Sequence, residues 1–268
     1  MADSNAPVGL FDSGVGGLTV AHAIHALLPG EQLLYYGDTA HLPYGDKSKE
    51  TIVRYSTGIA DFLLEHGCKV ILIACNSASA NAYREVREHV GERAVVLNVV
   101  DPVVEHVTST INGQSIGVIG TRATIESGSY QQGIRDKAPS LTVRSLATPL
   151  FVPMIEEGFI SDDISDAIIR AYLSRKELND IDTLILGCTH YPIIREQISR
   201  YYNSAVNVID SARIVAGYLR KFLTANNLLS PNRAGENKFF ISEQTGSFES
   251  IGRMFFHEKI NLEKRSIW

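Results

Sequence analysis

The chain has 268 residues, which is long for one hydrophobic core and sufficient for two domains of about 100–150 residues each. Its 44% hydrophobic and 21% charged content is that of an ordinary globular protein, and its net charge of −5 offers no basic surface to nucleic acid or to an anionic membrane. No apolar run reaches the roughly 18–20 residues that cross a bilayer, so we expect neither a nucleic-acid partner nor a membrane segment.

The chain contains three cysteines, Cys68, Cys75 and Cys188, and none of them has CxxC spacing. An odd and sparse set of cysteines argues against a disulfide framework and against a zinc site. Residues Met1–Pro7 lack the basic start and the apolar run of a secretory signal. The sequence therefore predicts a cytoplasmic protein whose cysteines have individual roles.

Short apolar runs alternate along the chain with longer amphipathic stretches, the pattern of buried strands separated by helices. The predicted strands are Val8–Phe11, Gln32–Tyr36, Val70–Ala74, Ala94–Val99, Ser115–Ile119, Thr142–Leu146, Thr183–Leu186 and Val206–Ile209. The predicted helices are Leu18–Leu28, Ser48–His66, Ala78–His89, Ser161–Leu173, Arg195–Tyr202 and Ala212–Ala225. A loop at Ser230–Asn237 precedes an expected final strand around Lys238–Ser242. Strands that alternate with helices predict an α/β fold with mainly parallel sheets.

The two halves of the chain echo each other. Val8–Ser13 resembles Ile116–Thr121, since each is an apolar strand that ends in a small turn with a hydroxyl. Val70–Ser77 resembles Thr183–His190, since each strand delivers a cysteine to a polar segment. This repetition predicts two pseudo-symmetric α/β halves that face each other across a cleft.

Cys75 and Cys188 each follow directly after an apolar run. Because open α/β sheets bind ligands beyond the carboxyl ends of their strands, thiols at these positions belong to a site. Free cysteine is also a common buried residue, and that interpretation fits Cys68. A thiol hydrolase needs one cysteine, whereas inversion of a carbon centre needs a base on one face and an acid on the other. The mirrored pair therefore favours two-base inversion over hydrolysis.

Two further segments carry polar residues that could serve such a site. The glycine-rich turn at Phe11–Leu18 lacks nucleotide-binding spacing, and its Asp12 fits either a helix cap or a carboxylate beside a thiol. Gly37–Gly45 is too rich in turn formers for a strand or a helix. We expect it to cover the site and to offer the backbone of Tyr44 and Gly45, although an ordinary surface loop with a buried tyrosine fits equally.

Among the eight histidines, only His190 adjoins a proposed catalytic residue. An imidazole beside a catalytic thiol needs a partner that fixes its tautomer, and Glu156 or Glu157 could supply it. The other interpretation of these two carboxylates is a pair of solvated acids at the start of a helix.

With these residues assembled, the sequence resembles the glutamate racemase family over nearly its whole length. The resemblance rests on Gly9–Gly17, Tyr36–Ala40 with Pro43–Gly45, Ala74–Ala78, Phe151–Pro153 with Glu156, and Leu186–Pro192. It implies two α/β domains, residues 1–100 plus 210–268 and residues 101–209, with glutamate enclosed between them. It also implies cofactor-independent interconversion of L- and D-glutamate, which supplies peptidoglycan synthesis, and a homodimer.

By this resemblance Cys75 and Cys188 exchange the proton, Asp12 assists Cys75, and His190 supported by Glu156 assists Cys188. The implied substrate contacts are Asp12, Ser13, Tyr44, Gly45, Asn76, Ser77, Thr121, Thr124, Thr189 and His190. Two positions depart from the family: Ser77 replaces a common threonine but keeps its hydroxyl, and Thr148 replaces a cysteine that is not an acid/base. An aspartate racemase and a non-catalytic amino-acid-binding protein remain as alternatives.

Overall fold

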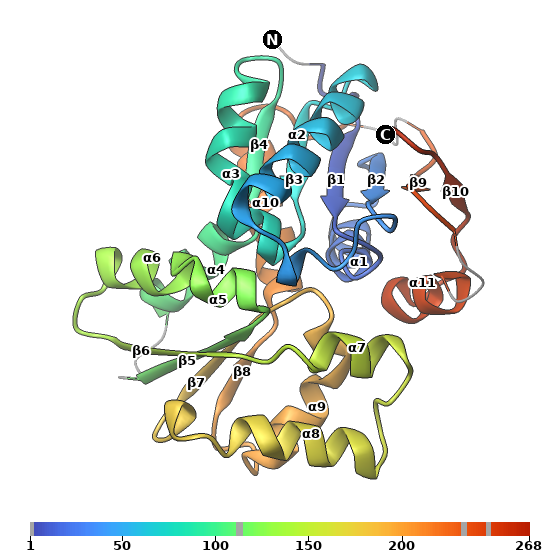
Figure 1. The fold of residues 1–268 in the computed structure, drawn as a ribbon. Coiled ribbons are helices and arrows are strands. Elements are labelled where there is room, and N and C mark those ends of the chain that lie inside the picture. The colour runs from blue at the N-terminus through green and yellow to red at the C-terminus, as the bar shows by residue number, and fades with distance from the viewer. Residues whose placement is uncertain (1–2, 111–114, 232–234, 245–247) are drawn as a thin grey trace.

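The computed structural model describes residues 3–110, 115–231, 235–244 and 248–268 (Figure 1). Its strands are β1 (Val8–Asp12), β2 (Leu33–Gly37), β3 (Val70–Ile73), β4 (Val95–Asn98), β5 (Ser115–Gly120), β6 (Thr142–Ala147), β7 (Thr183–Gly187), β8 (Asn207–Ile209), β9 (Lys238–Ile241) and β10 (Leu262–Lys264). They form two parallel sheets, one of six strands in the order β10-β9-β2-β1-β3-β4 and one of four in the order β6-β5-β7-β8.

Helices lie between most of these strands. They are α1 (Leu18–Leu27), α2 (Lys49–Glu65), α3 (Asn76–Val90), α4 (Val100–Thr110), α5 (Arg122–Glu126), α6 (Ser129–Lys137), α7 (Phe151–Glu156), α8 (Asp163–Leu173), α9 (Arg195–Tyr201), α10 (Ser211–Ala225) and α11 (Phe248–Phe256). Short 3₁₀ helices occur at η1 (Tyr44–Asp46), η2 (Lys176–Leu178) and η3 (Tyr191–Ile194).

The central strands β1, β2 and β3 of the larger sheet are buried on both faces, because they are apolar at nearly every position rather than at alternate ones. Leu10 and Leu72 point to the face that packs with α1 and α10, whereas Phe11 and Ile73 point to the face covered by α2 and α3. Each sheet is thus the middle of three layers, and Figure 1 shows the smaller sheet below the larger one.

The smaller sheet is built in the same way. Val118 and Ile185 pack with α4 and α6, while Leu184 and Leu186 face the side of α7, α8 and α9. In Figure 1, α5 and α6 lie above these strands and α8 and α9 lie below them. The prediction of an α/β fold with two mainly parallel sheets is confirmed. The larger sheet draws its strands from residues 8–98 and 238–264, and the smaller from 115–209; the domain division at residues 100 and 210 stays a prediction.

Strand register places the chemistry-bearing residues. In the larger sheet Phe11 pairs with Ile73, so Asp12 ends one strand where Cys75 follows the next. In the smaller sheet Gly120 pairs with Gly187, so Thr121 and Cys188 leave their strands side by side. Both cysteines therefore lie at carboxyl ends of central strands, where open α/β sheets bind ligands.

The structure also corrects several expectations. Gly37 belongs to β2 and Tyr44–Asp46 form a 3₁₀ turn, so the segment Gly37–Gly45 is not wholly irregular. The strand at Lys238–Ile241 is not the last one, because α11 and β10 follow it. Part of the predicted loop Ser230–Asn237, residues 232–234, lies outside the described residues. No described helix is long and apolar enough to span a membrane.

Candidate active site

Cys75 is the N-cap residue of α3 and is 5% exposed. Its Sγ accepts the backbone N–H of Ala78 at 3.5 Å and lies 3.7 Å from the hydroxyl oxygen of Ser13. A helix N-terminus favours a thiolate. Burial and the negative charge of Asp12 act more strongly and raise the pKa of the Cys75 thiol to about 12. Cys75 therefore rests as a thiol, the form that can give up a proton.

Asp12 lies behind Cys75 and is fully buried. The Gly14 N–H donates to its Oδ2 at 3.0 Å, while its Oδ1 has no hydrogen-bond partner among the described residues. Burial raises the pKa of this carboxyl, and its interactions with His190 and Cys75 pull the other way. The N-cap of α1 is Gly17 and has no side-chain cap, so the interpretation of Asp12 as a helix cap is wrong. Its free oxygen leaves a proton acceptor beside the Cys75 thiol.

Cys188 follows β7, is 6% exposed, and has a different neighbour. Its Sγ lies 3.9 Å from Nδ1 of His190, and Nε2 of the same ring lies 2.9 Å from Oε1 of Glu156. Burial lowers the pKa of His190, but the hydrogen bonds and charges of Cys188 and Glu156 outweigh it and raise this pKa to about 10. An imidazolium at neutral pH can stabilise the thiolate form of Cys188.

Glu156 ends α7, and the neighbouring Glu157 is exposed. The interpretation of this acidic pair as the start of a helix is therefore wrong. Helix α7 brings only Glu156 to the histidine, and a residue 34 positions away in sequence fixes its ring. This carboxylate–imidazole–thiol arrangement has no equivalent beside Cys75, so the two thiols have unlike partners.

Both thiols line one small cavity with a volume of about 30 Å³. The lining residues come from both halves of the chain: Ser13, Gly14, Leu42, Pro43, Tyr44, Gly45, Cys75, Asn76, Ser77, Thr121, Val152, Glu156, Cys188, Thr189 and His190. Space for a water needs about 10–15 Å³, so this cavity is narrow. The predicted residues Asp12 and Thr124 lie behind its wall rather than on it.

Three hydroxyl groups join the two halves at one end of the cavity. Ser77 Oγ lies 2.8 Å from Thr121 Oγ1 and 3.4 Å from Thr124 Oγ1, and the two threonine hydroxyls are 3.0 Å apart. Gly45 reaches the same place, because a Cβ added to it would lie 2.7 Å from Cβ of Thr121. Only a glycine allows the two segments to approach this closely.

The hydroxyl of Tyr44 is held by Asp38. Tyr44 is fully buried, and its hydroxyl donates to Oδ2 of Asp38 at 2.6 Å. Burial, together with the charge of Asp38, raises the pKa of Tyr44 and keeps this hydroxyl protonated. Tyr44 and Gly45 both line the cavity, and contact of their backbone with a ligand stays a prediction.

Several supporting residues carried no sequence signal. His41 and Trp268 both contact Asp38, at 2.9 Å and 3.1 Å from its Oδ1, and so brace the Tyr44 turn. Thr19 on α1 donates to the Thr189 carbonyl at 3.0 Å and ties the first helix to the Cys188 segment. These contacts join residues up to 230 positions apart, which no local pattern reveals.

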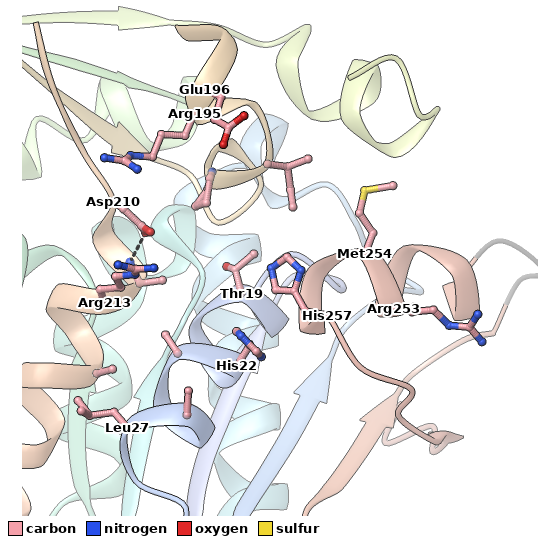
Figure 2. A pocket seen from close by; sticks show the side chains of 16 residues that line it. Thr19, His22, Leu27, Arg195, Glu196, Asp210, Arg213, Arg253, Met254 and His257 are labelled. Carbon is pink, nitrogen blue, oxygen red and sulfur yellow. Dashed lines mark hydrogen bonds between the residues drawn. The ribbon is translucent and has the colours of Figure 1, made fainter. Parts of the chain in front are cut away.

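A larger cavity of about 1070 Å³ lies elsewhere, among α1, α10, α11 and the segment around η3 (Figure 2). In Figure 2 the rings of His22 and His257 lie near each other, Met254 extends from α11, and Arg195, Glu196 and Asp210 lie farther off on the side of η3 and α10. Neither Cys75 nor Cys188 lines it, so its size does not make it the place of the chemistry. Among the described residues, no group of three or more His, Cys, Asp or Glu side chains is arranged to hold a metal ion.

The chain is similar to known proteins over nearly its whole length. A model of the family described as Asp/Glu/Hydantoin racemase matches residues 18–219. A glutamate racemase of Persephonella marina is 44% identical over 257 residues, which cover 96% of each chain. A crystal structure of glutamate racemase from Francisella tularensis, in complex with D-glutamate, has a TM-score of 0.92 at 39% identity and covers 98% of each chain.

An aspartate racemase of Picrophilus torridus is more distant. It has a TM-score of 0.57 at 19% identity and covers 84% of this chain and 99% of its own, a likeness that extends to the fold alone. The chain belongs to the Asp/Glu/hydantoin racemase family, in which it stands with the glutamate racemases.

Proposed function

We propose that this chain interconverts L- and D-glutamate without a cofactor, with Cys75 and Cys188 as acid and base on opposite faces of the α-carbon. One observation carries the proposal: a buried cysteine from the strand end of each sheet lines the same small cavity. Inversion needs two proton-transferring groups, whereas hydrolysis or simple binding does not need a second thiol.

In one direction of turnover Cys188, beside His190, acts as the base that removes the α-proton, while the Cys75 thiol delivers a proton to the opposite face. In the reverse direction Asp12 accepts the proton of Cys75, so that the Cys75 thiolate becomes the base. After one turnover the cysteine that acted as base carries a proton and the other has lost one. Each thiol must return to its starting protonation state before the next turnover in the same direction.

Hydroxyl and backbone groups would hold the two carboxylates of glutamate. None of the described residues that line the cavity is Lys or Arg. Ser13, Asn76 and Ser77 on one half, with Thr121 and Thr189 on the other, supply O–H and N–H donors, and the Gly45 backbone adds another. Donors fixed by the fold can stabilise negative charge that develops at the α-carbon without reorganising during the reaction.

Substrate entry requires the halves to separate. Glutamate is several times larger than the cavity of about 30 Å³, and the lining comes from both sheets. Opening would admit the substrate, and closure would exclude water and fix the thiols on either side of the α-carbon.

Replacement of each thiol tests the proposal. In Cys75→Ala and in Cys188→Ala, circular dichroism should show glutamate inversion reduced by about 10²–10⁴-fold in both directions, because each direction needs one acid and one base. Cys68→Ala is the matched control, since Cys68 is equally buried but outside the cavity. Inversion that persists in either active-site variant would remove the two-base mechanism.

Exchange with solvent gives an independent test. In D₂O, a two-base enzyme places deuterium in the product enantiomer, whichever enantiomer is supplied, because the departing and arriving protons use different thiols. Equal early labelling of substrate and product would instead indicate a single base. The same assay with L-aspartate measures substrate preference, for which we expect glutamate.

The proposal also covers the location of the protein, its assembly and the use of its product. We infer a cytoplasmic homodimer that supplies D-glutamate to peptidoglycan synthesis, as the family resemblance implies. Sedimentation of the purified chain checks the assembly: a monomer at the concentrations of the activity assay contradicts it.

A further inference from the structure

Tyr130 on α6 joins the two halves of the molecule behind the cavity. It is 1% exposed, and its hydroxyl donates to Oδ1 of Asn76 at 2.7 Å. Asn76 is the first residue of α3, directly after Cys75, and is 3% exposed. The bond therefore connects a helix that packs on the smaller sheet to the residue beside the cysteine of the larger sheet.

The ring of the same tyrosine lies against the strand that carries the other cysteine. A Cβ added to Gly187, the residue before Cys188, would lie 3.4 Å from Cε2 of Tyr130. That distance is ordinary van der Waals contact, so the ring packs on the end of β7. One buried side chain thus contacts the immediate neighbours of both cysteines.

The hydrogen bond between Tyr130 and Asn76 shows which way the amide of Asn76 faces. The Tyr130 hydroxyl donates to Oδ1, so the NH₂ group of the same amide points the other way. Burial first, and then the charges of Cys188 and Asp101, raise the pKa of Tyr130, so the hydroxyl keeps the proton that it donates. Asn76 lines the cavity, and its Nδ2 is buried without a hydrogen-bond partner among the described residues.

A buried NH₂ group without a partner is costly unless a ligand satisfies it. The Asn76 amide carries no charge and can rotate by about 180° about its Cβ–Cγ bond. Without Tyr130 its oxygen could therefore face the cavity instead. An amide oxygen would repel a carboxylate, whereas an NH₂ group donates to it.

We propose that Tyr130 is a positioning residue of the site: it holds the Asn76 amide with its NH₂ group toward a substrate carboxylate and braces the strand end that carries Cys188. The inference rests on the proposed function and goes beyond it, because Tyr130 touches neither the cavity nor a reacting atom.

Tyr130→Phe removes the hydroxyl and keeps the ring. We expect KM for glutamate to rise about three- to tenfold in both directions, with a smaller change in kcat, because a binding contact is lost in ground state and transition state alike. Tyr202→Phe is the matched control, since its buried hydroxyl has no partner in the described part of the chain. A KM for Tyr130→Phe within twofold of the control overturns the proposal.

A double-mutant cycle separates positioning from general loosening. If Tyr130 acts through Asn76, Tyr130→Phe should not raise KM further in an Asn76→Ala background. Additive effects on KM would mean that the hydroxyl acts by another route, and they overturn the assignment. Calorimetric binding of glutamate gives the same comparison for variants that turn over slowly.

Asn76→Asp provides a test that does not depend on the folding of Tyr130→Phe. It keeps an acceptor for the Tyr130 hydroxyl but replaces the NH₂ donor by an oxygen, so glutamate binding should weaken at least as much as in Asn76→Ala. Binding as tight as in the unmodified chain contradicts the proposed direction of the amide. If the unmodified chain itself fails to invert glutamate, it is the proposed function that fails.

Discussion

At the scale of single residues, the two thiols are set apart by the charge beside each sulfur. Cys75 has the buried carboxyl of Asp12 behind it, which helps to raise the pKa of the thiol to about 12. Cys188 has His190, whose own pKa is raised to about 10. The two thiols therefore occupy equivalent positions in the two halves, but their charged neighbours differ. We expect forward and reverse turnover to respond differently to pH.

Glu156→Gln tests the source of the His190 charge. The amide can still accept the Nε2–H bond, but it has no charge, so the pKa of His190 should fall from about 10 toward its ordinary 6.5. The alkaline limb of kcat/KM should move to lower pH by about one unit or more in the direction that uses His190 as a cation. Profiles measured for both directions check this.

Glu157→Gln is the control, because Glu157 is exposed and has the same sequence context.

The sign of the effect on stability follows from the raised pKa of His190 in the folded state. The contribution of protonated His190 is complete below pH 6.5 and is lost as pH rises through about 10. Glu156→Gln should therefore lower the free energy of unfolding most near pH 6.5, and a deficit that grows toward pH 10 would contradict the assignment.

At the scale of elements, a buried ion pair fastens the amino ends of β2 and β3. Lys69 Nζ lies 2.6 Å from Oε2 of Glu31, and both side chains are at most 2% exposed. Lys69 also donates to the carbonyl of Ser4, and the other oxygen of Glu31 accepts the N–H of Ser230. The pair thus holds the segment before β1 and the chain after α10 at the amino-terminal ends of β2 and β3.

Lys69→Met should lower the free energy of unfolding by about 3–5 kcal/mol, because it leaves a buried carboxylate without its counter-charge. Arg84→Met breaks the exposed Arg84–Glu88 pair, whose side chains are 85% and 64% exposed, and should cost less than about 1 kcal/mol. Urea unfolding measures both. If the Lys69→Met/Glu31→Met double variant recovers no stability, the unpaired charge is not the cause.

At the scale of the whole molecule, the cavity exists only where the two halves meet. A ligand held there contacts residues that follow β1 and β3 on one side and β5 and β7 on the other. Its binding energy therefore adds to the stability of the closed arrangement, in which both halves are folded and docked.

Glutamate should accordingly raise the melting temperature of the chain. At about 100 times the dissociation constant, the stabilisation is about 2.7 kcal/mol, and scanning calorimetry can follow the shift. L-Aspartate at the same concentration serves as the control, because its side chain is one methylene shorter and we expect it to bind more weakly. Equal shifts with the two amino acids would argue against glutamate as the preferred substrate.

Elements that follow from a local hydrophobic pattern can be predicted from the sequence, whereas elements that depend on contacts between distant residues cannot. The runs at β1, β3, β5 and β7 are apolar at nearly every position, and such runs predict buried parallel strands without further information. Strand β10 shows the opposite case. Of its three residues only Leu262 is buried, so no periodicity marks it, and its pairing with β9 supplies its order.

Sequence by itself determined the class of fold, the two cysteines at strand ends and the family, because hydrophobic pattern and motif spacing are local properties of the chain. Only the tertiary structure decided what each group does. It made Asp12 a thiol neighbour rather than a helix cap, chose Glu156 over Glu157 for His190, and set Tyr130 against Asn76. Hydrogen bonds and charges act over a few ångströms of space, and chain folding alone fixes which distant residues come within that range.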